Sequence, residues 1–130
     1  MYKILFIVAG GALGSLSRYW VSGYVQKMFS SFFPWGTLTV NAMGSLIIGM
    51  AWAIFEIRDI GPNTRMFLLV GFLGGFTTFS AFALETMGLM REGNLKMALW
   101  NIFSNNALTL IMVFVGYFLS RGFVGVVKGL

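Results

Sequence analysis

Four long apolar stretches divide this chain, and short polar joints separate them. The stretches run over residues 4–25, 38–57, 66–90 and 97–119. Each has about the 20 residues that a helix needs to cross a bilayer. The joints contain the turn-forming residues Pro34, Pro62 and Gly93. The pattern predicts an all-α integral membrane protein with a single four-helix transmembrane domain over residues 1–130.

The third stretch carries an interruption, because residues 71–82 read GFLGGFTTFSAF. Non-helical backbone at membrane depth is tolerated only where it faces protein, an ion or water. We therefore predict a broken third helix, with the break at Gly74 and Gly75 and a functional role for it. Phe79 and Phe82 are three residues apart, so they project from nearly one face of the helix that resumes after the break.

Composition supports the membrane prediction and excludes several function classes. The chain is 58% hydrophobic and 10% charged, with a mean hydropathy of +0.83, which is far more apolar than a soluble domain. Cysteine and histidine are absent, so thiolate chemistry and the commonest general base are missing. The serines lack a base, and the sequence has no phosphate loop or paired buried carboxylates, so we expect no enzyme activity.

Charge gives information about partners and orientation. The net charge is +5, but the basic residues are scattered singly, which favours contact with membrane lipids over nucleic acid. With four spans, the termini share a side with the second joint. That side carries Lys3, Arg58, Arg65, Arg121 and Lys128, and the other carries Lys27, Arg91 and Lys96. This near balance permits insertion in both directions and an antiparallel homodimer, while a single orientation held by the two-charge excess stays open.

Polar residues recur at four-residue intervals in two of the spans. In the second span Asn41 follows Thr37, and in the fourth span Asn101, Asn105 and Thr109 form a stripe. An asparagine amide can donate two hydrogen bonds to an anion without carrying charge, and a polar stripe suggests a wet path. Hydrogen bonding between helices is the alternative for both sets.

Two charged residues lie inside predicted spans. Arg18 is expected to face a vestibule or carbonyl oxygens, or to anchor the helix at the interface beside Tyr19 and Trp20. Glu85 is either a proton-coupling site or a hydrogen-bonding group at the end of a pore. The ring edges of Phe79 and Phe82 are electropositive and can contact a small anion, although packing is the commoner role of phenylalanine.

Three segments of the chain resemble the signature segments of the Fluc fluoride channels, also called the CrcB-like family. They are residues 10–19, residues 35–41, and residues 71–82 followed by Glu85. The resemblance covers essentially the whole chain. It implies an antiparallel, dual-topology dimer with two pores that exports fluoride passively across the microbial inner membrane. It also implies a structural sodium ion (Na+) at the centre of the dimer interface.

The resemblance further implies roles for individual residues. The pore phenylalanines would be Phe79 and Phe82, and the anion-donating asparagine would be Asn41. Backbone carbonyls of Gly74 and Thr77 would bind the sodium ion. The polar track would comprise Thr37, Asn101, Asn105 and Thr109, with Glu85 near its end and Ser80 as a nearby hydroxyl. The asparagines of the fourth span depart from the serine or tyrosine that is frequent in relatives.

Two other functions remain open at this point. A proton-coupled exporter resembling the small multidrug transporters would also be a short, dual-topology dimer. Those proteins rely on a carboxylate in the first helix, whereas this first span has Arg18 and no acid. A structural subunit of a larger membrane complex would use the polar stripes only to hold helices together.

Overall fold

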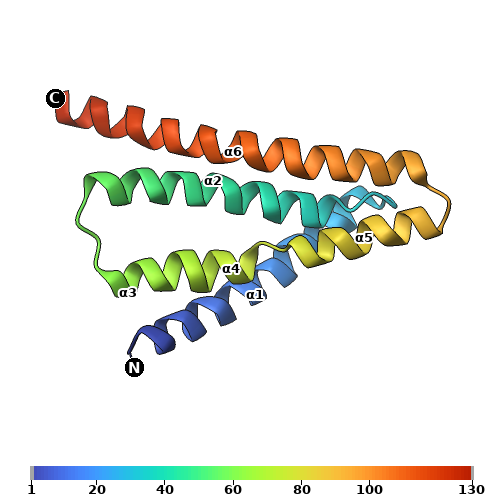
Figure 1. Cartoon of the computed structure of the whole chain (residues 1–130), viewed down its shortest axis with the longest axis horizontal. Coiled ribbons are helices and arrows are strands. Elements are labelled where there is room, and N and C mark those ends of the chain that lie inside the picture. The colour runs from blue at the N-terminus through green and yellow to red at the C-terminus, as the bar shows by residue number, and fades with distance from the viewer. Residues whose placement is uncertain (1, 130) are drawn as a thin grey trace.

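The computed structural model describes residues 2–129 as four long helical segments joined by short connections (Figure 1). The first, second and fourth segments are the single helices α1 (Tyr2–Phe29), α2 (Trp35–Ile57) and α6 (Leu95–Gly129). The third consists of α3 (Pro62–Arg65), the π-helix η1 (Met66–Leu73), α4 (Gly74–Phe76) and α5 (Phe79–Arg91). All four segments are long and apolar enough to cross a membrane. This confirms the predicted all-α membrane class.

The helical segments are longer than the apolar stretches that predicted them. The largest difference is at α6, which continues from the predicted end at residue 119 to Gly129 and runs beyond the end of α2 (Figure 1). Arg121 interrupts the apolar pattern there. It does not interrupt the helix, because arginine is a good helix former and its side chain is exposed.

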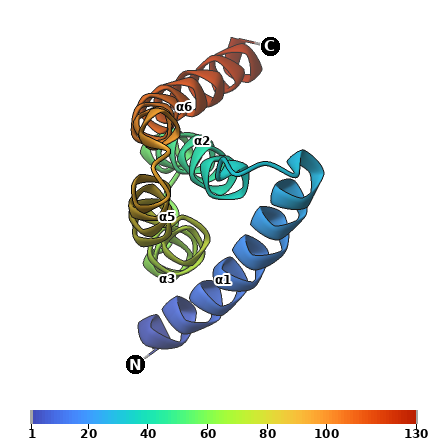
Figure 2. The same cartoon turned by 90° about the vertical axis from the view of Figure 1, so that its right-hand side faces the viewer.

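The second and fourth segments run parallel and side by side, whereas α1 leans across the third segment (Figures 1 and 2). Glycines allow the close approach of α2 and α6. A Cβ atom on Gly49 would collide with the Val113 carbonyl, and one on Gly116 would collide with the Leu46 carbonyl. The two helix backbones therefore touch at both positions.

Glycines also form the contact between α1 and the third segment. A Cβ atom on Gly71 would lie 2.7 Å from the Ile7 carbonyl oxygen, and one on Gly75 would lie 2.7 Å from the Gly11 carbonyl oxygen. Gly10 and Gly14 of α1 meet the backbone of the third segment in the same way. The small-residue faces of these two segments thus pack against each other within one subunit.

The third helix is broken, as predicted, but the break lies at Thr77 and Thr78 and not at the glycine pair. Thr77 has φ −88° and ψ 157°, and Thr78 has φ −153° and ψ 113°, so both are extended. Gly74 and Gly75 are helical. The prediction of the break position was wrong because Gly75 is required for the close approach of α1, not for an unusual backbone conformation.

Side chains secure two of the connections. Gln26 donates to the Ser31 and Phe33 carbonyls at 2.8 and 3.0 Å and accepts from the Gly36 amide at 3.1 Å, which holds the end of α1 against the start of α2. Arg65 donates to the Phe55 and Ile60 carbonyls at 3.2 and 3.1 Å. It thereby ties α3 to the end of α2.

A glycine turn forms the third connection. Gly93 has a φ of +79°, and the Asn94 amide returns to the Leu89 carbonyl at 2.9 Å. The Gly93 amide also bonds to the Met90 carbonyl at 3.1 Å. This pattern is a Schellman cap, in which glycine adopts the left-handed conformation that ends α5.

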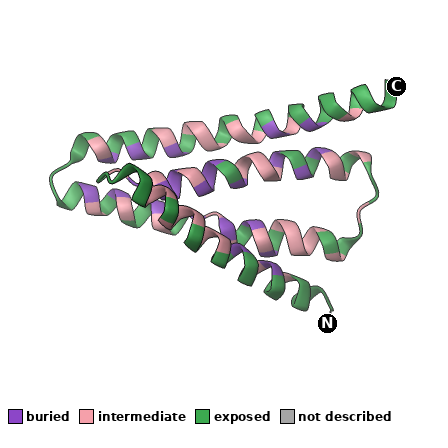
Figure 3. Cartoon of the chain, turned by 180° about the vertical axis from the view of Figure 1, so that it is seen from behind, coloured by how far each residue is buried: buried purple, intermediate pink, exposed green. Residues whose placement is uncertain are grey.

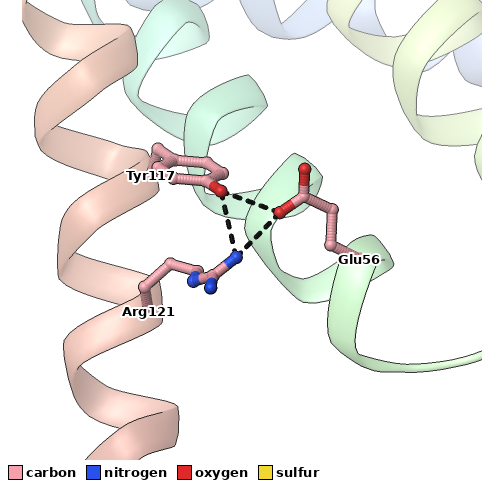
Figure 4. Close-up of polar contacts among 3 residues, drawn as sticks. All are labelled: Glu56, Tyr117 and Arg121. Atoms are coloured by element: carbon pink, nitrogen blue, oxygen red, sulfur yellow. Dashed lines mark hydrogen bonds and ion pairs between the residues drawn. The ribbon is translucent and has the colours of Figure 1, made fainter.

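A polar cluster joins α2 to α6 near the end of the bundle that carries both termini (Figures 1 and 4). The Tyr117 hydroxyl donates to Glu56 at 2.8 Å, and Arg121 forms an ion pair with the same carboxylate oxygen at 3.0 Å. Both charged side chains are substantially exposed, so the cluster contributes at most about 1 kcal/mol to stability.

Buried residues are concentrated along the facing sides of α2, α6 and the third segment, and α1 is mostly exposed (Figure 3). Val40, Ala53 and Ala98 are fully buried. Many large apolar side chains are exposed instead, among them Phe114 at 61% and Phe118 at 64%. Such a surface suits contact with lipid tails or with a second membrane-embedded chain.

Candidate functional site

An open groove of about 390 Å³ lies beside the break. It is formed by α2, the third segment and α6, so three of the four membrane-spanning segments contribute to it. Its polar residues are Asn41, Ser45, Thr77, Thr78, Asn105, Asn106 and Thr109. Its other residues are Gly44, Ile48, Leu69, Leu73, Gly74, Phe79 and Phe82. The groove therefore combines amides and hydroxyls with aromatic rings and carries no charged side chain.

The break redirects two backbone amides. In an uninterrupted helix the Thr78 amide would bond to the Gly74 carbonyl, and the Ala81 amide would bond to the Thr77 carbonyl. Here the Thr78 amide donates to Asn41 Oδ1 at 2.7 Å, and the Ala81 amide donates to Thr78 Oγ1 at 3.1 Å. Neither the Gly74 nor the Thr77 carbonyl receives the amide that a continuous helix would supply.

Asn41 holds the break from the neighbouring helix α2. Besides accepting from the Thr78 amide, it donates one amide hydrogen to the Thr78 carbonyl at 3.0 Å and the other to Asn105 Oδ1 at 3.0 Å. Its side chain is buried, with 8% exposure of the residue. Both donors that the sequence analysis assigned to an anion are thus bonded to protein in this structure.

The asparagines of α6 continue this network. Asn105 Nδ2 donates to Asn101 Oδ1 at 3.3 Å, and Asn101 Nδ2 donates to Thr86 Oγ1 at 2.9 Å. The Thr86 hydroxyl in turn donates to the Phe82 carbonyl at 2.8 Å. Thr109 bonds to the Asn105 carbonyl of its own helix at 2.7 Å.

The two phenylalanines after the break lie together but differ in exposure. Their ring centroids are 5.1 Å apart, and the planes of the two rings meet at 64° in an edge-to-face arrangement. The two rings therefore lie on one face of the helix, as their spacing predicted. Phe82 is 6% exposed, whereas Phe79 is 74% exposed. One ring therefore belongs to the interior of the subunit, and the other stands on its surface.

A second polar site lies near the connection between α1 and α2. Thr37 Oγ1 donates to Glu85 Oε1 at 2.6 Å, and Glu85 Oε2 has no hydrogen-bond partner among residues 2–129. Glu85 lines a separate hollow of about 330 Å³ together with Gln26, Phe32, Pro34, Gly88, Leu89 and Glu92. Thr37 and Glu85 are thus brought together, at a different place from the groove.

The sequence matches one protein family over most of its length. The model of the CrcB-like protein, Camphor Resistance (CrcB) family, matches residues 5–117. The chain belongs to this family. It is a multi-pass membrane protein, and its family is one of ion channels, not of enzymes.

Several curated relatives share this CrcB-like sequence across almost their whole length. One from Parabacteroides distasonis is 47% identical over 98% of this chain and 100% of the relative. One from Desulforapulum autotrophicum is 45% identical over 92% and 97%, and one from Thermus thermophilus is 42% identical over 95% and 97%. All three are named fluoride-specific ion channel FluC.

The groove of this CrcB-like chain gathers most of the residues that the resemblance assigned. Among its lining residues are Gly74, Thr77, Asn41, Phe79, Phe82, Asn105 and Thr109. Asn101 is fully buried behind the groove. Ser80 is exposed, with its hydroxyl 3.3 Å from that of Thr78. Arg18 is half-buried on α1 and forms no hydrogen bond or ion pair with residues 2–129.

The structure adds residues that the sequence analysis did not select. A Cβ atom on Gly44 would collide with the Thr77 side chain. The lack of a side chain at this position therefore lets the extended backbone of the break pack against α2. Thr86 connects Asn101 to Phe82, and Asn106 lines the groove. The spacing of Phe82 and Thr86, one helical turn apart, was a signal for Thr86. The contact of Gly44 was not readable, because it joins two segments distant in sequence.

Proposed function

We propose that this chain forms a passive, fluoride-selective channel. The observation that carries the proposal is the groove at the helix break, where amides, hydroxyls and phenylalanine rings meet without a fixed charge. The relatives named as fluoride-specific ion channels support the choice of ion. Fluoride is small and strongly hydrated, so a selective path must bring donors close enough to replace its water.

The donors available to fluoride can be named from the hydrogen bonds. Asn105 Nδ2 donates one hydrogen to Asn101, and its second hydrogen can serve an anion in the groove. The ring edge of Phe82 adds an electropositive surface that cannot hold the anion as tightly as a cation would. Asn41 can contribute only by exchanging a protein acceptor for the ion.

The conducting unit is proposed to be an antiparallel homodimer with two pores. A single subunit leaves the groove open and Phe79 74% exposed, so a second copy is needed to close the path. The nearly balanced basic residues at the two ends of the bundle support opposite insertion of the two subunits. We place the dimer in the microbial inner membrane, where the negative-inside potential favours anion exit by about 2.3 kcal/mol per 100 mV.

A structural sodium ion fits the backbone at the break. The Gly74 and Thr77 carbonyls lack the amides of a continuous helix, and Gly74 is exposed. Carbonyl oxygens are suitable ligands for a hard cation. Two such oxygens per subunit would hold the ion between two copies, and its charge would favour anions nearby.

Efflux from liposomes that contain only this protein tests the proposal. Fluoride release, measured with a fluoride electrode, should be rapid without a proton gradient, and chloride release should stay at the level of empty liposomes. Efflux that requires a proton gradient would favour the exporter, with Glu85 as its coupling residue. No efflux from a folded preparation would favour a structural subunit.

A further inference from the structure

A chain of hydrogen bonds with a single direction runs through the interior, from the break to the phenylalanine beside the groove. Asn41 donates to Asn105, Asn105 donates to Asn101, and Asn101 donates to Thr86. Thr86 then donates to the Phe82 carbonyl. Each asparagine accepts with its oxygen and donates with its nitrogen, so all the donors point the same way, and such bonds strengthen one another.

The side chains of this chain of hydrogen bonds are all buried. Asn101 is 0% exposed, Asn105 5%, and Asn41 and Thr86 8% each. Asn101 and Thr86 do not line the groove, so neither is placed to touch an ion there. A buried amide or hydroxyl without a hydrogen-bond partner costs free energy, so both side chains are constrained to keep their bonds.

Both ends of the chain meet the same short piece of helix. Asn41 of α2 bonds to the amide and carbonyl of Thr78, which caps α5 at its start. Asn101 of α6 bonds to Thr86, two turns further along α5. The two turns between these points carry Phe79 and Phe82. α5 is therefore held at both sides of its phenylalanines, by two different helices.

We propose that Asn101 and Thr86 are positioning residues for the ion path. They fix the positions of Phe82 and of the break through this chain of hydrogen bonds, and they do not bind fluoride themselves. This inference rests on the proposed channel function and refines it, because it removes Asn101 from the ion-lining track. If these bonds only held α5 and α6 together, their loss would not change the backbone at the break.

Substitutions at Thr86 separate the two roles. Thr86→Val has nearly the same shape but lacks the hydroxyl, so it leaves Asn101 Nδ2 without an acceptor. Thr86→Ser keeps the hydroxyl. We expect Thr86→Val to lower fluoride efflux on the order of tenfold and Thr86→Ser to remain within about twofold of the unaltered protein. Ser104→Ala is the matched control, because that hydroxyl bonds only within α6.

A second measurement tests the chain of hydrogen bonds and does not depend on ion flux. The Thr78 amide is bonded to Asn41, and its hydrogen exchange can be followed by NMR in detergent. Exchange at Thr78 should be faster in Thr86→Val than in Thr86→Ser or Ser104→Ala. Asn101→Ser, whose short side chain cannot reach both partners, should reproduce both effects and serves if Thr86→Val does not fold.

The outcomes are distinct. Reduced efflux together with faster exchange at Thr78, in a dimer that still elutes as a single species, supports the proposal. Either effect without the other, or unaltered behaviour of folded Thr86→Val and Asn101→Ser, overturns it. Absence of fluoride efflux from the unaltered protein would instead contradict the channel function. Hydrogen exchange at Thr78 would still decide whether the chain of hydrogen bonds holds the break.

Discussion

At the scale of single residues, the groove depends on side chains that bind the protein's own backbone. Asn41 contacts the amide and the carbonyl of Thr78, and the Thr78 hydroxyl caps α5 through the Ala81 amide. These bonds replace the helical bonds lost at the break, which in lipid would each cost several kcal/mol if left unmade. The extended backbone at Thr77 and Thr78 is thus stable because Asn41 and Thr78 satisfy it.

Replacing Phe82 with isoleucine should reduce fluoride efflux sharply while leaving a folded dimer. Isoleucine keeps an apolar side chain at this buried position but removes the electropositive ring edge. Phe114→Ile is the matched control, since Phe114 is 61% exposed on α6 and lies outside the groove. Efflux is measured with a fluoride electrode and normalised to the dimer recovered by gel filtration. Equal efflux from the two variants would assign Phe82 a packing role only.

Replacing Asn41 with aspartate should impair both transport and stability. Aspartate can still accept from the Thr78 amide, but it loses the donations to the Thr78 carbonyl and to Asn105. Two lost bonds at a buried site correspond to a destabilisation on the order of 2–4 kcal/mol. Asn94→Asp makes the same chemical change in the exposed turn before α6 and should have little effect. Thermal unfolding and liposome efflux would be compared, and an Asn41→Asp protein as stable as Asn94→Asp would contradict the clamp.

At the scale of elements, the sequence predicted which segments span the membrane but not where the third one breaks. Hydropathy reports the apolar length of a segment, and that was enough to find all four. The break position depends on Asn41 and Gly44, which lie more than 30 residues earlier on α2 and accept the extended backbone at Thr77 and Thr78. Gly74 and Gly75 drew attention as helix breakers, yet glycine in a membrane helix also serves close packing.

The same limit applies to the groove. The spacing of Phe79 and Phe82 correctly placed their rings together, because both lie on one continuous helix. The four-residue intervals at Asn101, Asn105 and Thr109 indicated one face of α6, but not which of these residues would be fully enclosed. Asn101 is covered because α5 packs on it through Thr86. Such enclosure is a property of tertiary packing, which a single helical period does not encode.

Replacing Gly116 with alanine should separate α2 from α6. The added methyl group would collide with the Leu46 carbonyl, which belongs to backbone and cannot rotate away. We expect a destabilisation of about 1–3 kcal/mol or more, seen as a lower unfolding temperature and loss of the dimer peak on gel filtration. Gly122→Ala on the same helix meets nothing within 4 Å and should be neutral or slightly stabilising. Similar profiles for the two variants would mean that α2 and α6 are not in backbone contact.

At the scale of the whole molecule, one subunit has every helix that the fold needs but only part of the proposed conducting path. Its groove is open, Phe79 is on the surface, and the Gly74 and Thr77 carbonyls lack their helical amides. All of these features lie around the same break. A second copy placed against this region would cover the groove and complete the proposed sodium site, so assembly and function are expected to be inseparable.

The orientation of the subunits can be tested by shifting the charge balance. Both termini lie at the same end of the bundle as the connection between α2 and α3 (Figure 1), and reporters fused to the C-terminus should appear on both sides of the membrane. A clear majority on one side would contradict dual topology. The first variant, Asp59→Lys, gives six basic residues at the terminal end against three at the opposite end. The second variant combines Glu92→Lys and Asn94→Lys with Lys3→Gln, Arg58→Gln and Lys128→Gln, which gives two against five; all six residues are exposed.

Each charge variant alone should insert in a single direction, because added lysines keep their end of the bundle in the cytoplasm. An antiparallel dimer then cannot form, so fluoride efflux from cells that express either variant alone should fall to the level of cells without the channel. Cells that express both variants together supply subunits of each orientation, and efflux should return. Strong efflux from the second variant alone, with its reporters all on one side, would show that parallel subunits conduct and would remove the antiparallel arrangement from the proposal.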